Sequence, residues 1–276
     1  MKSGRLLEEL KDIQANPLSD LNISVGLPDE NNIHKWRVTL KAPQDSNYNG
    51  GLFLAEIIFP EEYPDRSPEI HFITPIYHID VNPRKSQTEP LGHVSTTITN
   101  WWKPATTARE MLTKLFAIFY WQEPESPYSL DMCSEYRQNR ELYEHKVRYF
   151  TKKYASPSNI WKYDDKDWDF SVDEKELNSM RIKPKEEKLE VKTYDENEMI
   201  NLNFVMNGKV EKTFECKLNE LTENVAKKFM EKNSIKQDEN ILFIFNMKRL
   251  KFNAQIGDNG LKNNSRIIVI YDVMFA

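Results

Sequence analysis

Cysteine is scarce in this chain of 276 residues, which has only Cys133 and Cys216, far apart in sequence. Two isolated cysteines form neither a disulfide framework nor a metal-binding motif, and this favours a reducing cytosolic or nuclear setting. The histidines add no metal-ligand spacing, so we expect neither a metal nor a cofactor.

Long apolar runs and an excess of positive charge are also missing. No stretch approaches the roughly 18–20 apolar residues of a membrane span. The first ten residues place acids within their apolar pattern, which is not typical of a signal peptide. The formal net charge is −5, whereas a domain that grips nucleic-acid phosphates is normally basic. We therefore expect no membrane partner and no nucleic-acid partner.

The residues that are present favour folded, globular domains. Hydrophobic residues make up 39% and aromatic residues 12% of the chain, which is enough apolar mass for a sizeable core. At roughly 100–200 residues per domain, the length favours about two domains.

Residues 1–155 carry the pattern of an α+β layer fold. Residues 5–14 have the periodicity of an amphipathic helix. Short alternating strands follow, ending with 52–59 and 69–73, and prolines punctuate them. After an irregular stretch, helices are predicted over 107–121 and 129–154.

Residues 156–198 are rich in charge, and we interpret them as a linker. Trp161, Trp168 and Phe170 interrupt the acids, so the segment is either simply solvated or partly docked through these aromatics. Residues 199–276 then give the order strand, strand, helix, strand, strand, which predicts a small β-grasp domain with a hairpin turn at Asn207-Gly208.

The first domain resembles the ubiquitin-conjugating enzymes along nearly its full length. Five segments match the family's motifs in order: Trp36-Arg-Val-Thr-Leu40, Tyr48-Asn-Gly-Gly-Leu-Phe53, Phe59-Pro-Glu-Glu-Tyr-Pro64, Trp102-Lys-Pro-Ala105, and Thr151-Lys-Lys-Tyr-Ala155 after Tyr136, Arg140 and Tyr143. The resemblance implies a helix, a four-stranded antiparallel meander and C-terminal helices. The last domain resembles ubiquitin, but it ends without the Gly-Gly that conjugation requires.

The resemblance also implies where the catalytic positions lie. The family's cysteine falls at Ser95, in Gly92-His-Val-Ser-Thr96, and a hydroxyl ionises far less readily than a thiol. His78 matches the family's histidine, while Asp80 stands where an asparagine stabilises the oxyanion. An ionised carboxylate has no proton to donate there. The position that orients the incoming lysine is Ser126.

Partner-binding positions follow from the same resemblance. Lys2 and Arg5 match part of the basic face that binds activating enzyme and ligases. Pro104 and Ala105 keep one ligase loop, but Asp65 replaces the aromatic residue of the other, which predicts weak RING-ligase binding.

The ubiquitin patch of the last domain maps to Ile244 and Ile270, with basic neighbours. These aliphatics either form an exposed patch for a ubiquitin receptor or alternate into the core. The alternative partner that we expect for this tail is the sheet face of the chain's own first domain around Ser24.

The sequence therefore predicts a cytoplasmic or nuclear ubiquitin-pathway protein. We expect a conjugating-enzyme fold that is catalytically inactive and binds ubiquitin, a ubiquitin-like modifier, a conjugating enzyme or a ligase. Its ubiquitin-like tail would recruit a ubiquitin receptor. Two alternatives stay open: an active conjugating transferase whose acceptor is Ser95, including an engineered enzyme whose native residue is cysteine, and a scaffold that no longer touches ubiquitin. The altered Asp80 and the long loop at 82–90 argue against engineering.

Overall fold

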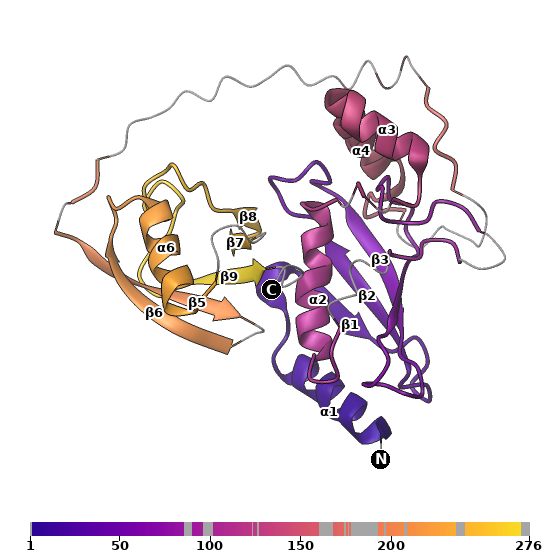
Figure 1. Ribbon diagram of the computed structural model, residues 1–276, viewed down its shortest axis with the longest axis horizontal. Helices are drawn as coiled ribbons and strands as arrows, with labels where there is room; N and C mark the ends of the chain where they lie inside the picture. The colour runs from indigo at the N-terminus through magenta and orange to yellow at the C-terminus, as the bar shows by residue number, and fades with distance from the viewer. Residues whose placement is uncertain are drawn as a thin grey trace. The chain divides into compact units, whose positions relative to one another are not determined.

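The chain divides into two compact units, residues 1–183 and 184–276, in a computed structural model (Figure 1). The structure describes residues 2–85, 90–95, 102–122, 124–125, 127–159, 168–173, 175, 177, 193–195, 197–206, 209–235 and 241–271. Among the described residues, no helix has the length and apolar character needed to cross a membrane.

The first unit is a helix, a four-stranded sheet and further helices. Its elements are α1 (Lys2–Ala15), η1 (Ser19–Leu21), β1 (Ile23–Gly26), β2 (Lys35–Lys41), β3 (Leu52–Ile58), β4 (Glu69–Phe72), α2 (Ala108–Phe116), η3 (Ala117–Phe119), α3 (Leu130–Gln138) and α4 (Arg140–Tyr154). The strands pair in the order β1-β2-β3-β4, all antiparallel. The predicted α+β meander is therefore confirmed.

Alternation along β2 fixes which sheet face meets the core. Trp36, Val38 and Leu40 are each 0% exposed, while the residues between them are partly exposed. Successive side chains of a strand point to opposite faces, so these three share the buried face. Phe119 of η3 packs against Phe53 of β3, with ring centroids 5.4 Å apart. The stretch that we expected to be one deeply buried helix over 107–121 is α2 followed by η3.

The single helix predicted over 129–154 is two helices. Asn139 separates α3 from α4 because its backbone is not helical, with φ −144° and ψ 71°. Its side chain accepts a hydrogen bond from the Leu142 N–H at 3.1 Å, as an N-cap does. The sequence carries neither proline nor glycine between Ser129 and Tyr154, so it did not show the break.

The second unit is a mixed sheet covered on one face by a helix. It contains β5 (Met199–Met206), β6 (Lys209–Lys217), α6 (Thr222–Lys232), β7 (Ile241–Phe245), β8 (Lys248–Arg249) and β9 (Ser265–Tyr271). The strand order is β6-β5-β9-β7-β8, with β5 parallel to β9. This arrangement confirms the predicted β-grasp fold. The predicted turn at Asn207-Gly208 lies outside the described residues, although β5 and β6 pair as its two arms.

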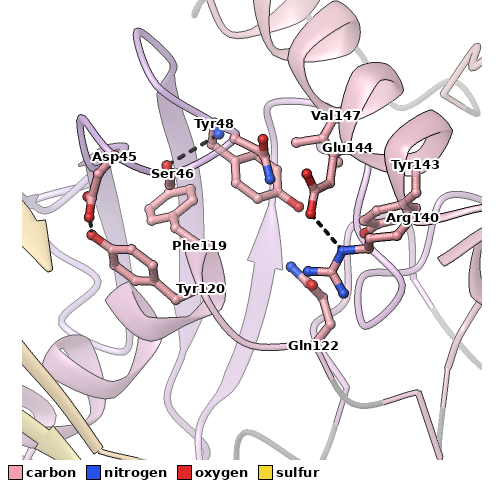
Figure 2. Close-up of a pocket in the computed structure, with 11 residues that line it drawn as sticks. Asp45, Ser46, Tyr48, Phe119, Tyr120, Gln122, Arg140, Tyr143, Glu144 and Val147 are labelled. Carbon is pink, nitrogen blue, oxygen red and sulfur yellow. Dashed lines mark hydrogen bonds and ion pairs between the residues drawn. The ribbon is translucent and has the colours of Figure 1, made fainter. Parts of the chain in front are cut away.

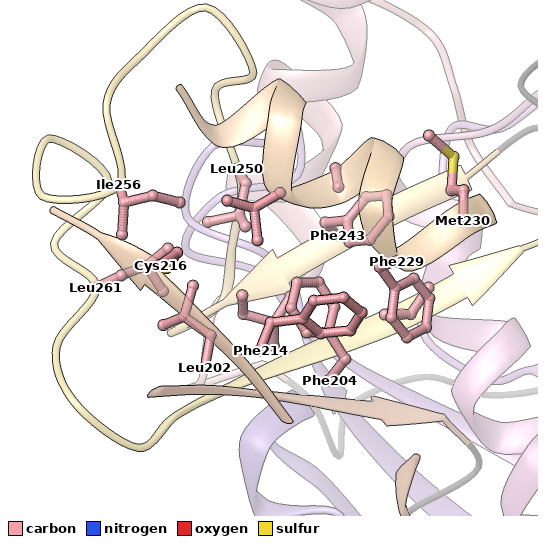
Figure 3. Packing of buried hydrophobic residues seen from close by; sticks show 14 of the residues in the cluster. Leu202, Phe204, Phe214, Cys216, Phe229, Met230, Phe243, Leu250, Ile256 and Leu261 are labelled. Atoms are coloured by element: carbon pink, nitrogen blue, oxygen red, sulfur yellow. The ribbon is translucent and has the colours of Figure 1, made fainter. Parts of the chain in front are cut away.

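Phenylalanines form the centre of the second unit's core (Figure 3). Phe229 of α6 stacks on Phe204 of β5 at 4.6 Å, with an interplanar angle of 15°. Phe243 of β7 meets Phe229 edge-on at 6.0 Å. Burying such rings removes a large apolar area from water, so α6 and the sheet stabilise each other.

The predicted linker is not uniformly solvated. Trp168 is 9% exposed, and Phe170 packs on Phe150 of α4 with centroids 4.8 Å apart. The simply solvated alternative is therefore wrong for these two residues, and they dock on the first unit. Trp161 lies outside the described residues. The predicted boundaries at 155 and 198 stay predictions.

Candidate functional site

The chain around Ser95 is held by two neighbouring segments of the first unit. His93 forms a β-bridge with His71 of β4, and Val94 forms one with Val81. The Ser95 N–H then donates a hydrogen bond to the Asp80 carbonyl oxygen at 2.8 Å. The fold thus brings together the predicted nucleophile position and the predicted oxyanion position. The Ser95 residue is 5% exposed.

Gly92 allows this stretch to lie tightly against β4. Its φ is +75°, and a Cβ added there would meet the Phe72 carbonyl oxygen at 2.0 Å. The Gly92 carbonyl in turn accepts the Phe72 N–H at 2.8 Å. A side chain at this position would therefore displace the segment that carries Ser95.

His78 is fully buried and uses both of its ring nitrogens. Nδ1 accepts the Asp80 N–H at 3.1 Å. Nε2–H therefore donates to the carbonyl oxygens of Ile118 and Trp121, at 3.0 and 3.2 Å. Burial lowers the pKa of His78, outweighing the opposing effect of the Asp80 charge. A neutral histidine whose nitrogens are both engaged serves to hold residues 78–80 against η3 and is not free to act as a base for Ser95.

Asp80 lies in a buried environment that contains two tyrosines. The residue is 3% exposed, and one carboxylate oxygen lies 3.6 Å from His78 Nδ1. Burial is the main cause that raises the pKa values of Tyr48 and Tyr143, and the Asp80 charge raises both further. Both phenols stay neutral at physiological pH, so the carboxylate has no nearby phenolate. In the sequence, these tyrosines stand out only as motif residues.

A cavity of about 110 Å³ separates the β2–β3 loop from α4 (Figure 2). Tyr48 and Tyr143 line it, and Arg140 pairs with Glu144 at its edge, with 2.7 Å between Nε and Oε1. The Tyr48 hydroxyl donates to the Tyr77 carbonyl oxygen at 3.0 Å. The cavity has room for a few water molecules, and Tyr48 and Tyr143 separate it from Asp80.

Ser126, the predicted lysine-orienting position, lies outside the described residues. The chain just after it is placed, because the Tyr128 N–H donates to the Ile79 carbonyl oxygen at 2.8 Å. The Tyr128 hydroxyl lies 2.5 Å from His93 Nδ1. His93 was expected to be an ordinary surface or packing residue, and no motif marks its contact with Tyr128. This contact is formed by residues 35 positions apart.

Arg5 and the 104–106 loop, predicted as separate partner surfaces, form one cluster. The Arg5 guanidinium donates to the carbonyl oxygens of Pro104 and Thr106 and pairs with Glu9 at 2.7 Å. Pro104 and Ala105 remain exposed. The Lys2 side chain lies outside the described residues.

Asp65 is exposed after Pro64, and its N–H donates to the Glu62 carbonyl oxygen at 2.8 Å. No aromatic side chain stands at this position. The loop that would supply a ligase anchor is therefore polar here.

Ser24 is exposed on β1 and lines a shallow groove of about 510 Å³ between α1 and the outer sheet face. Ile13 of α1, Val25 of β1, Thr39 of β2 and Leu52 of β3 contribute to its walls. The groove combines apolar walls with small hydroxyls.

Ile244 and Ile270 are 0% and 2% exposed, and the patch that they would form for a ubiquitin receptor stays a prediction. Their neighbours Phe243 and Val269 belong to the core under α6. Because side chains alternate along a strand, the two isoleucines lie on the sheet face opposite α6. The two isoleucines therefore do not belong to the core under α6, which was the alternative to a patch.

Among the residues that the structure describes, no group of three histidine, cysteine or acidic side chains could hold a metal ion. Cys133 and Cys216 are both buried and unpaired. Burial raises the pKa of the Cys216 thiol to about 11, so this thiol is a poor nucleophile at neutral pH.

Two family models match the chain. Residues 5–151 match the one described as ubiquitin-conjugating enzyme, and residues 200–270 match the one described as ubiquitin-2 like Rad60 SUMO-like. Among solved structures, a Plasmodium yoelii protein assigned as a ubiquitin conjugating enzyme is 29% identical, with a TM-score of 0.49, over 56% of this chain and 96% of that one. The E2 domain of a Toxoplasma gondii ubiquitin conjugating enzyme is 29% identical, with a TM-score of 0.48, over 56% and 100%.

Proposed function

The chain belongs to the ubiquitin-conjugating enzyme family, and on this premise we propose that its first unit is catalytically inactive and binds ubiquitin or a partner conjugating enzyme. The second unit, a SUMO-like ubiquitin domain, acts in this proposal as a recruitment module. The observation that carries the proposal is the serine at position 95, hydrogen-bonded through its backbone to Asp80.

The histidine of the family motif is not available as a general base for Ser95. A thiol with a pKa near 8.5 supplies some thiolate at neutral pH, whereas a serine hydroxyl requires an adjacent general base. His78 is the histidine that the family motif places nearby, and both of its nitrogens are engaged elsewhere. This supports the proposal that Ser95 does not accept ubiquitin.

Asp80 also argues against catalysis, at the step in which a lysine attacks the loaded enzyme. Lysine attack on a thioester builds negative charge on oxygen, and catalysis depends on donors aimed at that charge. An ionised carboxylate at the asparagine position supplies no donor and repels the charge. Even a loaded chain would therefore discharge slowly.

The groove around Ser24 supports binding. It joins apolar walls to small hydroxyls on an exposed sheet face, a combination that suits a modest protein interface. We assign ubiquitin or a ubiquitin-like modifier to this groove. The second unit recruits a further factor, for which a ubiquitin receptor is the best candidate. Cytoplasm or nucleus remains the proposed location.

A loading assay tests inactivity. The chain is incubated with activating enzyme, ATP and ubiquitin, and adducts are separated without reductant. We expect no adduct. The alternative function is an active transferase at Ser95, which the match to the ubiquitin-conjugating enzyme family favours. It requires an adduct that resists thiol but is cleaved by hydroxide, and finding one would replace our proposal.

A titration of ¹⁵N-labelled ubiquitin with the full chain tests binding. We expect shift changes that Ser24→Arg abolishes, because the added side chain fills the groove. Ser158→Arg is the matched control, since Ser158 is exposed and does not line the groove. Shifts that persist unchanged in Ser24→Arg would place ubiquitin elsewhere on the chain.

A further inference from the structure

An aromatic surface lies where α4 meets the start of the candidate site. Phe150 of α4 stacks on Tyr77 with centroids 5.2 Å apart, and Tyr154 stacks on Phe150 at 6.0 Å. We call Tyr77, Phe150 and Tyr154 the aromatic platform. Tyr77 directly precedes His78, so the platform ends at the segment that carries His78 and Asp80.

Residues 168–170, which we call the strap, cover this platform. The Phe170 ring meets Tyr77 edge-on at 5.2 Å, Phe150 at 4.8 Å and Tyr154 at 6.1 Å. Trp168 is 9% exposed and packs edge-on against Phe170 at 6.1 Å. Edge-to-face contacts of this kind are favourable beyond the area that they bury.

Polar contacts hold the strap at Asp169, between the rings of Trp168 and Phe170. The Tyr154 hydroxyl donates to the Asp169 carbonyl oxygen. The Asp169 carboxylate lies 4.0 Å from the Lys153 ammonium and accepts the Ser171 N–H at 2.8 Å. These contacts therefore favour an acidic residue flanked by two aromatic residues at positions 168–170.

The strap touches both ends of the segment 77–83. Phe170 packs on Tyr77 at one end, and the Trp168 N–H donates to the Pro83 carbonyl oxygen at 3.4 Å at the other. His78 and Asp80 lie between these contacts. The family match ends at residue 151, so the strap is a feature of this chain outside the matched region.

We propose that Trp168–Phe170 is a strap that positions the candidate site by clamping residues 77–83, and that its release frees this segment. These are positioning residues, since neither ring is shown to contact Ser95. The proposal concerns the geometry of residues 77–83 and holds whether or not Ser95 accepts ubiquitin.

Amide hydrogen exchange of the full chain tests the clamp. Three amides within the segment report on it: Asp80 N–H bonds to His78 Nδ1, Val81 N–H to the His78 carbonyl, and Asn82 N–H to the His93 carbonyl. Phe170→Ala removes three ring contacts to the platform and one to Trp168, so we expect the exchange of these amides to accelerate at least about tenfold. The amides of Val38 and Ala55, in the β2–β3 pairing, should change less than about twofold.

Three further variants make the result specific. Phe170→Tyr keeps the ring and should preserve protection at all three reporters. Phe170→Leu keeps apolar area without the ring, so we expect a smaller acceleration of amide exchange at the three reporters. This variant replaces Phe170→Ala if the alanine variant is poorly folded. Phe252→Ala removes a ring of the same size from the second unit and should leave these reporters unchanged.

Two outcomes overturn the proposal. Unchanged exchange at Asp80, Val81 and Asn82 in both Phe170→Ala and Phe170→Leu shows that the segment holds itself. Equal acceleration of these amides and those of Val38 and Ala55 shows that Phe170 stabilises the whole unit and does not clamp the site.

Discussion

The Ser95 N–H and the Asp80 carbonyl oxygen are joined by a hydrogen bond of 2.8 Å. Because this bond uses main-chain atoms, it does not depend on which side chains occupy the two positions. A cysteine at 95 or an asparagine at 80 should therefore enter the same backbone frame, and the two side chains can be tested independently.

Restoring the thiol should restore loading but not transfer. We expect Ser95→Cys to form a thiol-sensitive ubiquitin adduct that discharges slowly to free lysine, because Asp80 opposes the oxyanion. Adding Asp80→Asn should speed discharge by about 10²–10³-fold, the usual effect of one oxyanion donor. Single-turnover discharge measures both rates, and Ser95→Ala is the blank. Rapid discharge from Ser95→Cys alone would show that Asp80 does not limit transfer.

Low pH should destabilise the first unit through His78. Its folded-state pKa is lowered by burial, so below the ordinary value of about 6.5 the unfolded chain binds the proton more readily. Stability is then full above about pH 6.5 and falls as pH drops, by at most about 1.4 kcal/mol per pH unit for each such histidine. His71 acts in the same direction, with its pKa lowered by burial and by His93.

Ring-proton NMR and denaturant unfolding between pH 7.5 and 5.5 check this dependence. The His78 ring signal should show no inflection near pH 6.5. His71→Gln separates the two contributions, because the part due to His78 should persist in that variant. A His78 ring that titrates near 6.5 contradicts the buried, neutral histidine.

Gly92→Ala should be far more destabilising than Gly50→Ala. Both glycines have positive φ, +75° and +84°, but only Gly92 has backbone in the space of a Cβ. The conformational cost alone is about 1–2 kcal/mol, which is what we expect at Gly50. Displacing the Phe72 carbonyl should bring Gly92→Ala to about 4 kcal/mol or more. Chemical unfolding compares the free energies of unfolding of the two variants. Equal losses would mean that β4 moves away from the added Cβ at little cost.

Arg5→Lys should not substitute for Arg5. The guanidinium reaches the Pro104 and Thr106 carbonyl oxygens at once, and an ammonium cannot copy this forked geometry. We expect a loss of about 1–2 kcal/mol in the free energy of unfolding, reduced by the partial exposure of Arg5. Lys11→Ala, an exposed change on the same helix, is the control. Equal stabilities would indicate that the 104–106 loop is held by its other contacts.

Cutting the chain between residues 183 and 184 should give two pieces that unfold cooperatively, since the units divide there. Ending the first piece at 155 should lower its stability by about 2–4 kcal/mol, because Trp168 and Phe170 no longer cover the platform. Thermal and urea unfolding of residues 1–183 and 1–155 provide the comparison. Equal stabilities of these two pieces would show that residues 156–183 are a linker that does not stabilise the first unit.

Local patterns were enough to predict much of the fold. Alternation in Trp36, Val38 and Leu40 set the buried face of β2, because strand side chains have a period of two. Helical periodicity predicted α1 and α6, and the ordered motifs located Ser95, His78 and Asp80 as site positions. Each of these signals is contained within a few neighbouring residues.

Long-range contacts were decided only by the tertiary structure. Periodicity at Ile244 could not say which sheet face α6 covers, because that depends on where the helix packs. The bond from Arg5 to Pro104, the contact of Tyr128 with His93 and the docking of Phe170 on Tyr77 join residues between 35 and 99 positions apart. The sequence by itself determined which residue types occupy the site. Folding alone decided which of them meet, because such contacts depend on the closure of long loops and leave no local pattern.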